Sequence, residues 1–101
     1  MSTLGKRLKS VRLSAGLSQE QLGVQAGIEE ASASARMNRY EKGTRAPAIE
    51  IVQQIAYVLV VPVSYFFSEN DDEAELLLAF HRMSAEGRRG VLQFVHSVSA
   101  E

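Results

Sequence analysis

Two neighbouring side chains near the middle of the chain, Asn38 and Arg39, have the chemistry to recognise nucleic-acid bases. An arginine can donate two hydrogen bonds to O6 and N7 of guanine, and an asparagine can pair in a similar two-pronged way with N6 and N7 of adenine. Side chains that can donate to phosphate oxygens follow at Lys42, Thr44 and Arg45. The pattern indicates a nucleic-acid contact, and its alternative is a set of ordinary solvated residues.

Charge is divided unevenly along the 101 residues, although the net charge is only −1. Residues 1–67 carry eight basic and five acidic side chains, a balance of +3, whereas residues 68–101 carry three basic and seven acidic ones, a balance of −4. A basic front part is typical of proteins that bind a polyanion, and the acidic tail indicates a different role. The alternative explanation is ordinary surface charge.

Other kinds of chemistry find no support in the residue pattern. The chain has no cysteine, which excludes disulfides and thiolate metal sites, and no acidic pairing makes His81 or His96 a metal ligand. No nucleophile motif, catalytic carboxylate pair or glycine-rich phosphate loop is visible, so we expect neither an enzyme nor a cofactor. The most apolar stretch, residues 55–67, is too short to span a membrane. With no secretory signal evident, we expect a cytoplasmic protein.

The elements that must position these side chains are helices, because the hydrophobic pattern predicts an all-α chain. Ser18 should cap the second helix, with Gln21 at the capping-box position. Residues 1–68 should form the compact unit and residues 69–101 a helical extension that can serve for dimerisation. The expected helices begin close to Leu4, Ser18, Glu30 or Ser32, Pro47, Pro62, Leu76 and Ser84.

Two glycines favour a tight turn between the second and third helices. Gly23 lacks a side chain where two helix backbones approach, and Gly27 can adopt the positive φ that the turn requires. A small core should hold the helix pair together, with Met37 and Tyr40 contributed by the third helix. The other expected members of this core are Leu22, Ala26 and Ile28. The alternative is a generic helical hairpin.

Four segments in this order resemble the Cro/CI-type repressors, the Xre family of helix-turn-helix regulators. They are Leu-Gly-Lys-Arg-Leu-Lys (4–9), Gly-Leu-Ser-Gln-Glu-Gln-Leu (16–22), Arg-Met-Asn-Arg-Tyr-Glu-Lys-Gly (36–43) and Pro-Val-Ser-Tyr-Phe-Phe (62–67). The resemblance implies a five-helix Cro/CI repressor-like DNA-binding domain, followed by one or two additional C-terminal helices. It also implies a sequence-specific transcriptional repressor of duplex DNA whose third helix, ending at Lys42, reads the major groove.

The resemblance assigns roles to individual residues. Ser34, Ala35 and Arg39 match the family's main base-contacting positions, and Gln19 matches its phosphate-binding residue. Because Met37 and Tyr40 should be buried, the outward face also contains Asn38, with Arg36 on its flank. Lys42, Thr44 and Arg45 should bind phosphates of the same half-site. Arg12 and Glu41 match a pair whose salt bridge supports the reading helix.

Two features depart from the family. Eight residues, 29–36, lie between Ile28 and Met37, where relatives commonly have four. We expect the additional turn to lengthen the third helix, because alanines dominate it and four residues preserve the buried face, while a longer loop is the alternative. Val60 stands where glycine is common, and a left-handed backbone there would strain a β-branched residue.

The extension at residues 69–101, called the tail below, carries more apolar side chains than a protein normally exposes to water. It must therefore fold back on the compact unit or pair with another chain. We expect a homodimer, formed by these helices or by the Tyr65-Phe66-Phe67 region, because the family's operators are usually two-fold. The expected partner is an operator in duplex DNA. Two alternatives are an antitoxin, whose partner would be a toxin, and a protein-interaction module that has lost DNA binding.

Overall fold

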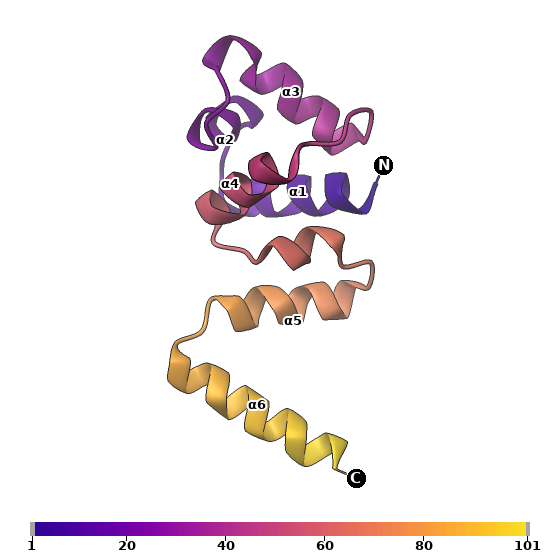
Figure 1. The fold of residues 1–101 in the computed structure, drawn as a ribbon, viewed down its shortest axis with the longest axis vertical. Coiled ribbons are helices and arrows are strands. Elements are labelled where there is room, and N and C mark those ends of the chain that lie inside the picture. The colour runs from indigo at the N-terminus through magenta and orange to yellow at the C-terminus, as the bar shows by residue number, and fades with distance from the viewer. Residues whose placement is uncertain (1, 101) are drawn as a thin grey trace.

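The computed structural model describes residues 2–100 as helices joined by short turns, which confirms the all-α fold (Figure 1). The end positions of the expected units, residues 1 and 101, lie outside the described residues. The fifth helix, η1, has 3-10 geometry. The elements are α1 (Thr3–Ser14), α2 (Gln19–Gln25), α3 (Glu30–Lys42), α4 (Ile49–Leu59), η1 (Val63–Phe67), α5 (Asp71–His81) and α6 (Ala85–Ser99).

Local sequence signals set three of the helix starts, where Ser2, Ser18 and Ser84 cap α1, α2 and α6. The Ser18 hydroxyl accepts from the Gln21 backbone N–H at 3.0 Å, and the Gln21 side chain accepts from the Ser18 N–H at 2.8 Å, so the expected capping box is present. The longer third helix is also confirmed, since α3 begins at Glu30. Pro47 was expected to begin the fourth helix, but α4 begins two residues later, after Ala48.

The core lies where α1 to α4 and η1 meet. Its largest fully buried side chains belong to α1, α2, α3, α4 and η1: Leu8, Leu22, Met37, Tyr40, Ile55 and Phe66. Of the two regions expected to form a dimer, the aromatic run offers little free surface, because the rings of Tyr65 and Phe66 are buried within one chain. They pack edge to face, with ring centroids 5.6 Å apart. Of this aromatic run only Phe67 is exposed.

The two glycines of the turn have the geometry that the sequence predicts. A Cβ atom on Gly23 would lie 2.8 Å from the Cβ of Ala33, so α2 and α3 can approach this closely only at a glycine. Ala33 is itself fully buried in the additional turn of α3, in line with Met37 one turn later. Gly27 has a φ of 92° and turns the chain between the two helices.

Arg7 connects α1 to the segment that precedes α5 and to the first residue of α5. Its buried guanidinium donates to the carbonyl oxygens of Ser68 and Glu69, at 3.0 and 3.3 Å, and to the carboxylate of Asp71 at 2.8 Å. The hydrogen bond from Arg7 and the charge of Lys6 hold the pKa of the Asp71 carboxyl below its ordinary value. One arginine therefore connects α1 to the start of α5.

Two further arginines cap helix ends in the tail. Arg82 donates to the carbonyl oxygens of Leu59 and Val60, at 2.9 and 3.0 Å, and so joins the end of α5 to the end of α4. Arg88, in the first turn of α6, donates to the carbonyl oxygen of His81 at 2.7 Å. Both contacts satisfy carbonyl groups that a helix terminus leaves without partners. The Arg82 contact holds α5 on the core, whereas the Arg88 contact joins the start of α6 to the end of α5.

The molecule is elongated, with extents of 53 × 25 × 22 Å. Figure 1 shows α3 at one end and α6 at the other, with α1 and α5 between them. Ala74 and Leu78 pack α5 against the core, whereas α6 projects beyond it and contains no buried residue. None of the helices in the described chain is long and apolar enough to cross a membrane.

Val60 ends α4 in the left-handed conformation, with φ 55° and ψ 54°. Within residues 2–100 it is the only residue other than glycine with a positive φ. Because the Cβ of an L-residue clashes there, the conformation costs about 1–2 kcal/mol. The valine side chain is 56% exposed, so little packing offsets this cost.

We expect Val60→Gly to raise the free energy of unfolding by about 0.5–1 kcal/mol, since relief of the clash exceeds the entropic cost of glycine. Urea denaturation measures the change. Val60→Ala is the matched control, because it keeps the Cβ atom and should gain much less. A lower stability for Val60→Gly would show that the valine side chain contributes more by packing than it costs by strain.

Candidate nucleic-acid interface

The side of α3 that faces away from the core carries the residues expected to contact DNA bases. Burial of Met37 and Tyr40 is confirmed, and it directs the other side chains of the helix outward. Ser34, Ala35 and Arg39 are exposed. Arg36 and Asn38 are less exposed than these three residues, because each contacts another side chain of the domain.

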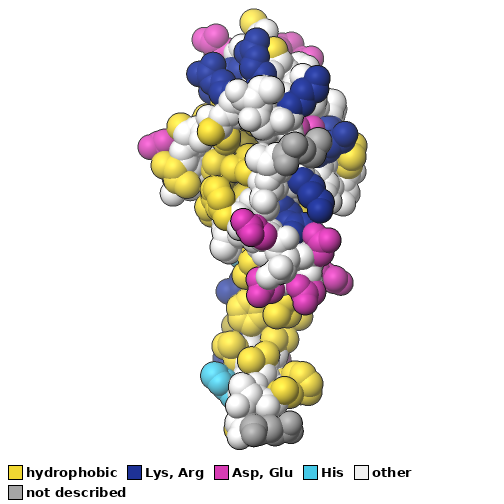
Figure 2. Space-filling view, turned by 90° about the vertical axis from the view of Figure 1, so that its right-hand side faces the viewer, with side chains coloured by type: hydrophobic (Ala, Val, Ile, Leu, Met, Phe, Trp, Pro, Cys, Tyr) yellow, Lys and Arg dark blue, Asp and Glu magenta, His cyan; other side chains and the backbone are white. Residues whose placement is uncertain are grey.

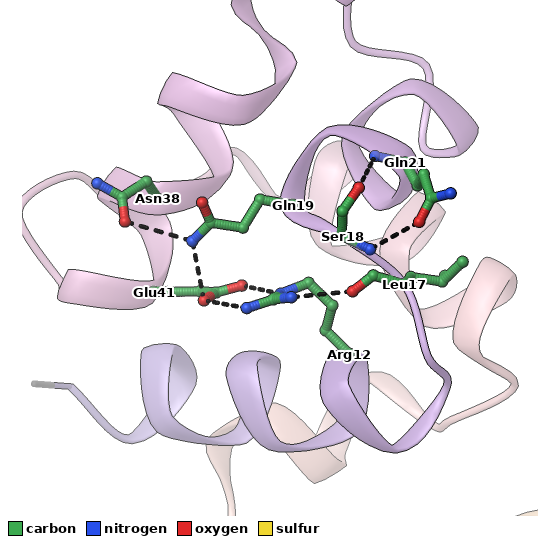
Figure 3. A network of polar contacts seen from close by, with 7 residues as sticks. All are labelled: Arg12, Leu17, Ser18, Gln19, Gln21, Asn38 and Glu41. Atoms are coloured by element: carbon green, nitrogen blue, oxygen red, sulfur yellow. Dashed lines mark hydrogen bonds and ion pairs between the residues drawn. The ribbon is translucent and has the colours of Figure 1, made fainter.

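A buried ion pair holds α3 against α1. The Arg12 guanidinium donates to both oxygens of the Glu41 carboxylate, at 2.6 and 3.1 Å, and to the carbonyl oxygen of Leu17 at 2.9 Å (Figure 3). Arg12 and Glu41 are 8% and 2% exposed. The salt bridge that the family resemblance implied is therefore present, and a two-pronged geometry of this kind fixes both position and angle.

Gln19 extends this network from the core to the outer side of α3. Its amide nitrogen donates to the Glu41 carboxylate at 3.1 Å and to the side-chain oxygen of Asn38 at 3.3 Å (Figure 3). The capping box formed by the preceding Ser18 fixes the first turn of α2, and with it the position of Gln19. Two residues assigned to separate DNA contacts by the sequence, Gln19 and Asn38, thus contact each other.

Arg36 lies along the side of α3 rather than extending freely from it. Its Nε and Nη2 atoms donate to the Tyr40 hydroxyl, at 3.2 and 2.8 Å, and its guanidinium lies 5.9 Å from the centre of the same ring. The sequence indicated Arg36 only as a flanking base contact. In the structure the phenol of Tyr40, which is buried, holds the arginine in place.

Basic side chains border this face. Lys42 and Arg45 are exposed, as their expected role requires, whereas the Thr44 hydroxyl lies 3.4 Å from the Arg39 carbonyl oxygen and helps to close α3. Lys9 was not among the residues that the sequence assigned to the interface. It lines the same cleft of about 440 Å³ as Gln19, Asn38 and Lys42, and its membership of the basic N-terminal part was the only available signal.

The charge distribution follows the long axis. On the face shown in Figure 2, most Lys and Arg side chains lie in the half of the molecule that contains α3, several acidic side chains cluster near the middle, and apolar ones lie along the tail. The acidic cluster includes Asp71, Asp72 and Glu73, in the first turn of α5. The division of charge seen along the sequence is therefore also a division in space.

The chain matches a protein family described as "Helix-turn-helix domain" over residues 3–64. Two curated relatives are uncharacterized HTH-type transcriptional regulators, one from Sinorhizobium medicae (strain WSM419) and one from Rhizobium meliloti (strain 1021). Each is 38% identical over 66 residues, which is 65% of this chain. The match covers 45% of each relative, so the chain spans about half the length of the curated relatives it matches.

The fold is similar to two solved structures. The crystal structure of the transcriptional regulator BswR superimposes with a TM-score of 0.87 and 41% identity, over 92% of both chains. A chain of the SinR protein/SinI protein complex superimposes with a TM-score of 0.66 and 23% identity, over 97% of this chain and 99% of that one. The second likeness concerns the fold alone.

We expect Glu41→Ala to lower the free energy of unfolding by about 3–5 kcal/mol, because it leaves the buried Arg12 charge without its carboxylate. Thermal or urea denaturation measures the loss. The matched control is Glu75→Ala, which removes an exposed glutamate from α5 and should change stability by less than about 0.5 kcal/mol. Equal stabilities of the wild type and Glu41→Ala would contradict a structural role for the pair.

Proposed function

The chain belongs to the helix-turn-helix family of transcriptional regulators, and from this premise we propose that it is a sequence-specific repressor of duplex DNA. In this proposal α3 enters the major groove, and occupation of the operator by the protein blocks transcription. Residues 1–68 read the DNA, and residues 69–101 join two copies of the chain.

The proposal rests on the position of Arg39. This residue lies on the exposed side of α3, and the opposite side of the helix is held against α1. The ion pair of Arg12 and Glu41 binds α3 to α1, so the reading helix needs no rearrangement before it meets DNA. Arg39 then has the reach and the donor geometry for O6 and N7 of guanine. Ser34 and Ala35 are exposed near the other end of the same helix, where small side chains permit close approach to base edges.

Phosphate contacts on both sides of α3 complete the proposed interface. Lys42 and Arg45 follow the reading helix, and Lys9 lies across the cleft from it on α1. Such contacts supply affinity and set the register of the protein on the duplex, but carry little sequence information. The acidic cluster on α5 lies apart from α3, where its repulsion of the DNA backbone is weakest.

We expect Arg39→Ala to weaken binding to the preferred operator by about 1–3 kcal/mol and to relax specificity at one base pair of each half-site. Lys42→Ala should instead weaken binding to all sequences alike and reduce the salt slope by about one. Selection of bound sequences and salt titrations by fluorescence anisotropy measure both effects. Arg89→Ala, an exposed arginine of α6, is the control and should change neither. An unaltered sequence preference in Arg39→Ala would remove α3 from the proposed role.

The dimer of this proposal forms through the tail. Apolar side chains recur at three- and four-residue steps along one side of α6, and remain exposed in the single chain: Leu92 (46%), Phe94 (70%), Val95 (43%) and Val98 (49%). Leu76, which is 52% exposed, is a further exposed apolar side chain on α5. Exposed apolar side chains that gather on one helix in this way mark an interaction surface.

A second copy of the chain is the partner that fits this surface best. An apolar stripe is complementary to itself, so two copies related by a two-fold axis bury the same residues on both sides. The axis then lies at the end of the molecule opposite α3, which leaves both reading helices free for two half-sites.

We expect the wild type to be a dimer at micromolar concentration and the Leu92→Glu/Val95→Glu double variant to be a monomer. Sedimentation equilibrium measures the masses. The monomer should bind a two-site operator about a hundredfold more weakly, because the second half-site is no longer held at high effective concentration. Leu13→Glu is the control, since it alters an exposed leucine of α1 (58%, against 46% for Leu92) that lies outside the tail. A monomeric wild type would exclude this assembly.

A further inference from the structure

Arg36 carries a positive charge that the protein holds in place on the side of α3. Its Nε and Nη2 atoms donate to the Tyr40 hydroxyl, at 3.2 and 2.8 Å, and its guanidinium lies 5.9 Å from the centre of the same ring. Tyr40 is only 1% exposed, so the core fixes the phenol that accepts from the arginine. Within residues 2–100 no carboxylate forms an ion pair with this guanidinium. The charge of Arg36 is therefore positioned but not neutralised.

Three of the five N–H groups of Arg36 point away from the tyrosine. A guanidinium has one N–H on Nε and two on each terminal nitrogen, and Tyr40 accepts one from Nε and one from Nη2. Nη1 therefore keeps both of its N–H groups, and Nη2 keeps one. One N–H from each terminal nitrogen forms a parallel fork, which matches two oxygens of a phosphate group.

Arg36 and Asn38 lie on opposite flanks of α3, because residues two apart in an α-helix point about 200° apart. The flank of Asn38 borders the cleft that Lys9 lines from α1. On the other flank, Tyr40 lines a separate cleft of about 340 Å³ together with Arg45. Each flank of the reading helix therefore has its own basic side chains.

A helix in the major groove directs its outer side to the base edges and its two flanks to the sugar-phosphate backbones that border the groove. Ala35 and Arg39 occupy the outer side of α3, whereas Tyr40 holds Arg36 back along one flank. We propose that Arg36 binds a phosphate of the DNA strand that faces this flank, and that the Tyr40 hydroxyl positions it for this contact. The inference rests on the proposed reading role of α3, and it differs from the base contact that the sequence suggested for Arg36.

The two strands of a half-site are then bound from opposite sides of the reading helix. Lys9 faces the strand on one side, and Arg36 with Arg45 faces the strand on the other. Such a contact supplies affinity and register rather than sequence choice. Because Tyr40 already orders the guanidinium, Arg36 loses less conformational entropy on binding than a mobile arginine would. Tyr40 is thus a positioning residue that acts through Arg36.

The direct test uses an operator selected from random duplexes, in which single phosphates are replaced in turn by uncharged methylphosphonates. In the wild type, replacement of the phosphate that Arg36 binds should weaken binding about tenfold. In Arg36→Gln the same replacement should have little further effect, while every other position behaves as in the wild type. Lys9→Gln should lose its response to a phosphate of the opposite strand.

Salt titrations and a second selection separate a phosphate contact from a base contact. Arg36→Gln should bind all sequences about tenfold more weakly and lower the salt slope by about one, with the preferred sequence unchanged. Arg36→Lys should recover the salt slope, because it keeps the charge. Arg89→Gln is the matched control, since it removes an exposed arginine of α6 and should alter neither quantity.

The role of the hydroxyl is measured with Tyr40→Phe. This variant should weaken binding about threefold when Arg36 is present, since the guanidinium must then be ordered by the DNA, and should have no effect in Arg36→Gln. Tyr57→Phe is the matched control, because it removes the hydroxyl of a tyrosine on α4 that is 83% exposed. Thermal unfolding of each variant shows that the compared proteins are folded.

Three results would overturn the inference. They are an unchanged affinity or an altered base preference in Arg36→Gln, a phosphate response on the same strand as that of Lys9, and an equal loss from Tyr40→Phe with and without Arg36. Each of them leaves the proposed function intact, since the wild type still selects a sequence. Absence of any selected sequence for the wild type would instead contradict the proposed function, and with it the inference.

Discussion

The ion pair between Arg12 and Glu41 is the interaction on which the rest of the domain depends. It connects α1 to the end of α3, takes in the loop before α2 through the Leu17 carbonyl, and reaches α2 through Gln19. Three helices that share only a small apolar core are thereby held at fixed angles. Removal of two charges from water is costly unless both are fully hydrogen-bonded, and among the described residues no buried side-chain nitrogen or oxygen lacks a partner.

Local signals allowed the sequence to predict the helices and the tight turn. The Ser18 capping box, the glycine at position 27 and the alanines of the additional turn each act within a few residues, and each has its expected geometry. The spacing of Met37 and Tyr40 identified the buried side of α3 and, by difference, the exposed side. The start of α4 was less predictable, because a proline is compatible with the first turn of a helix and also with the residues before it.

The contacts between distant segments could not be read from the sequence. Arg7 meets the start of α5 more than sixty residues later, and Arg82 meets the end of α4, yet neither belongs to a local pattern. The same reason explains why Gln19 and Asn38 were assigned to separate contacts. The sequence could not decide whether the aromatic run at residues 65–67 belongs to the core or to an interface, because both environments give the same sequence signal; in the structure Tyr65 and Phe66 are buried.

The distance between the reading helix and the apolar helix has a consequence for the spacing of operators. In a pair joined through α6, the separation of the two α3 helices depends on the bend between α5 and α6, which Arg88 holds from one side. Residues that do not contact nucleic acid would then determine the distance between the two half-sites. Under the proposed function, changes confined to this bend would alter which operators are bound while the side chains of α3 stay the same.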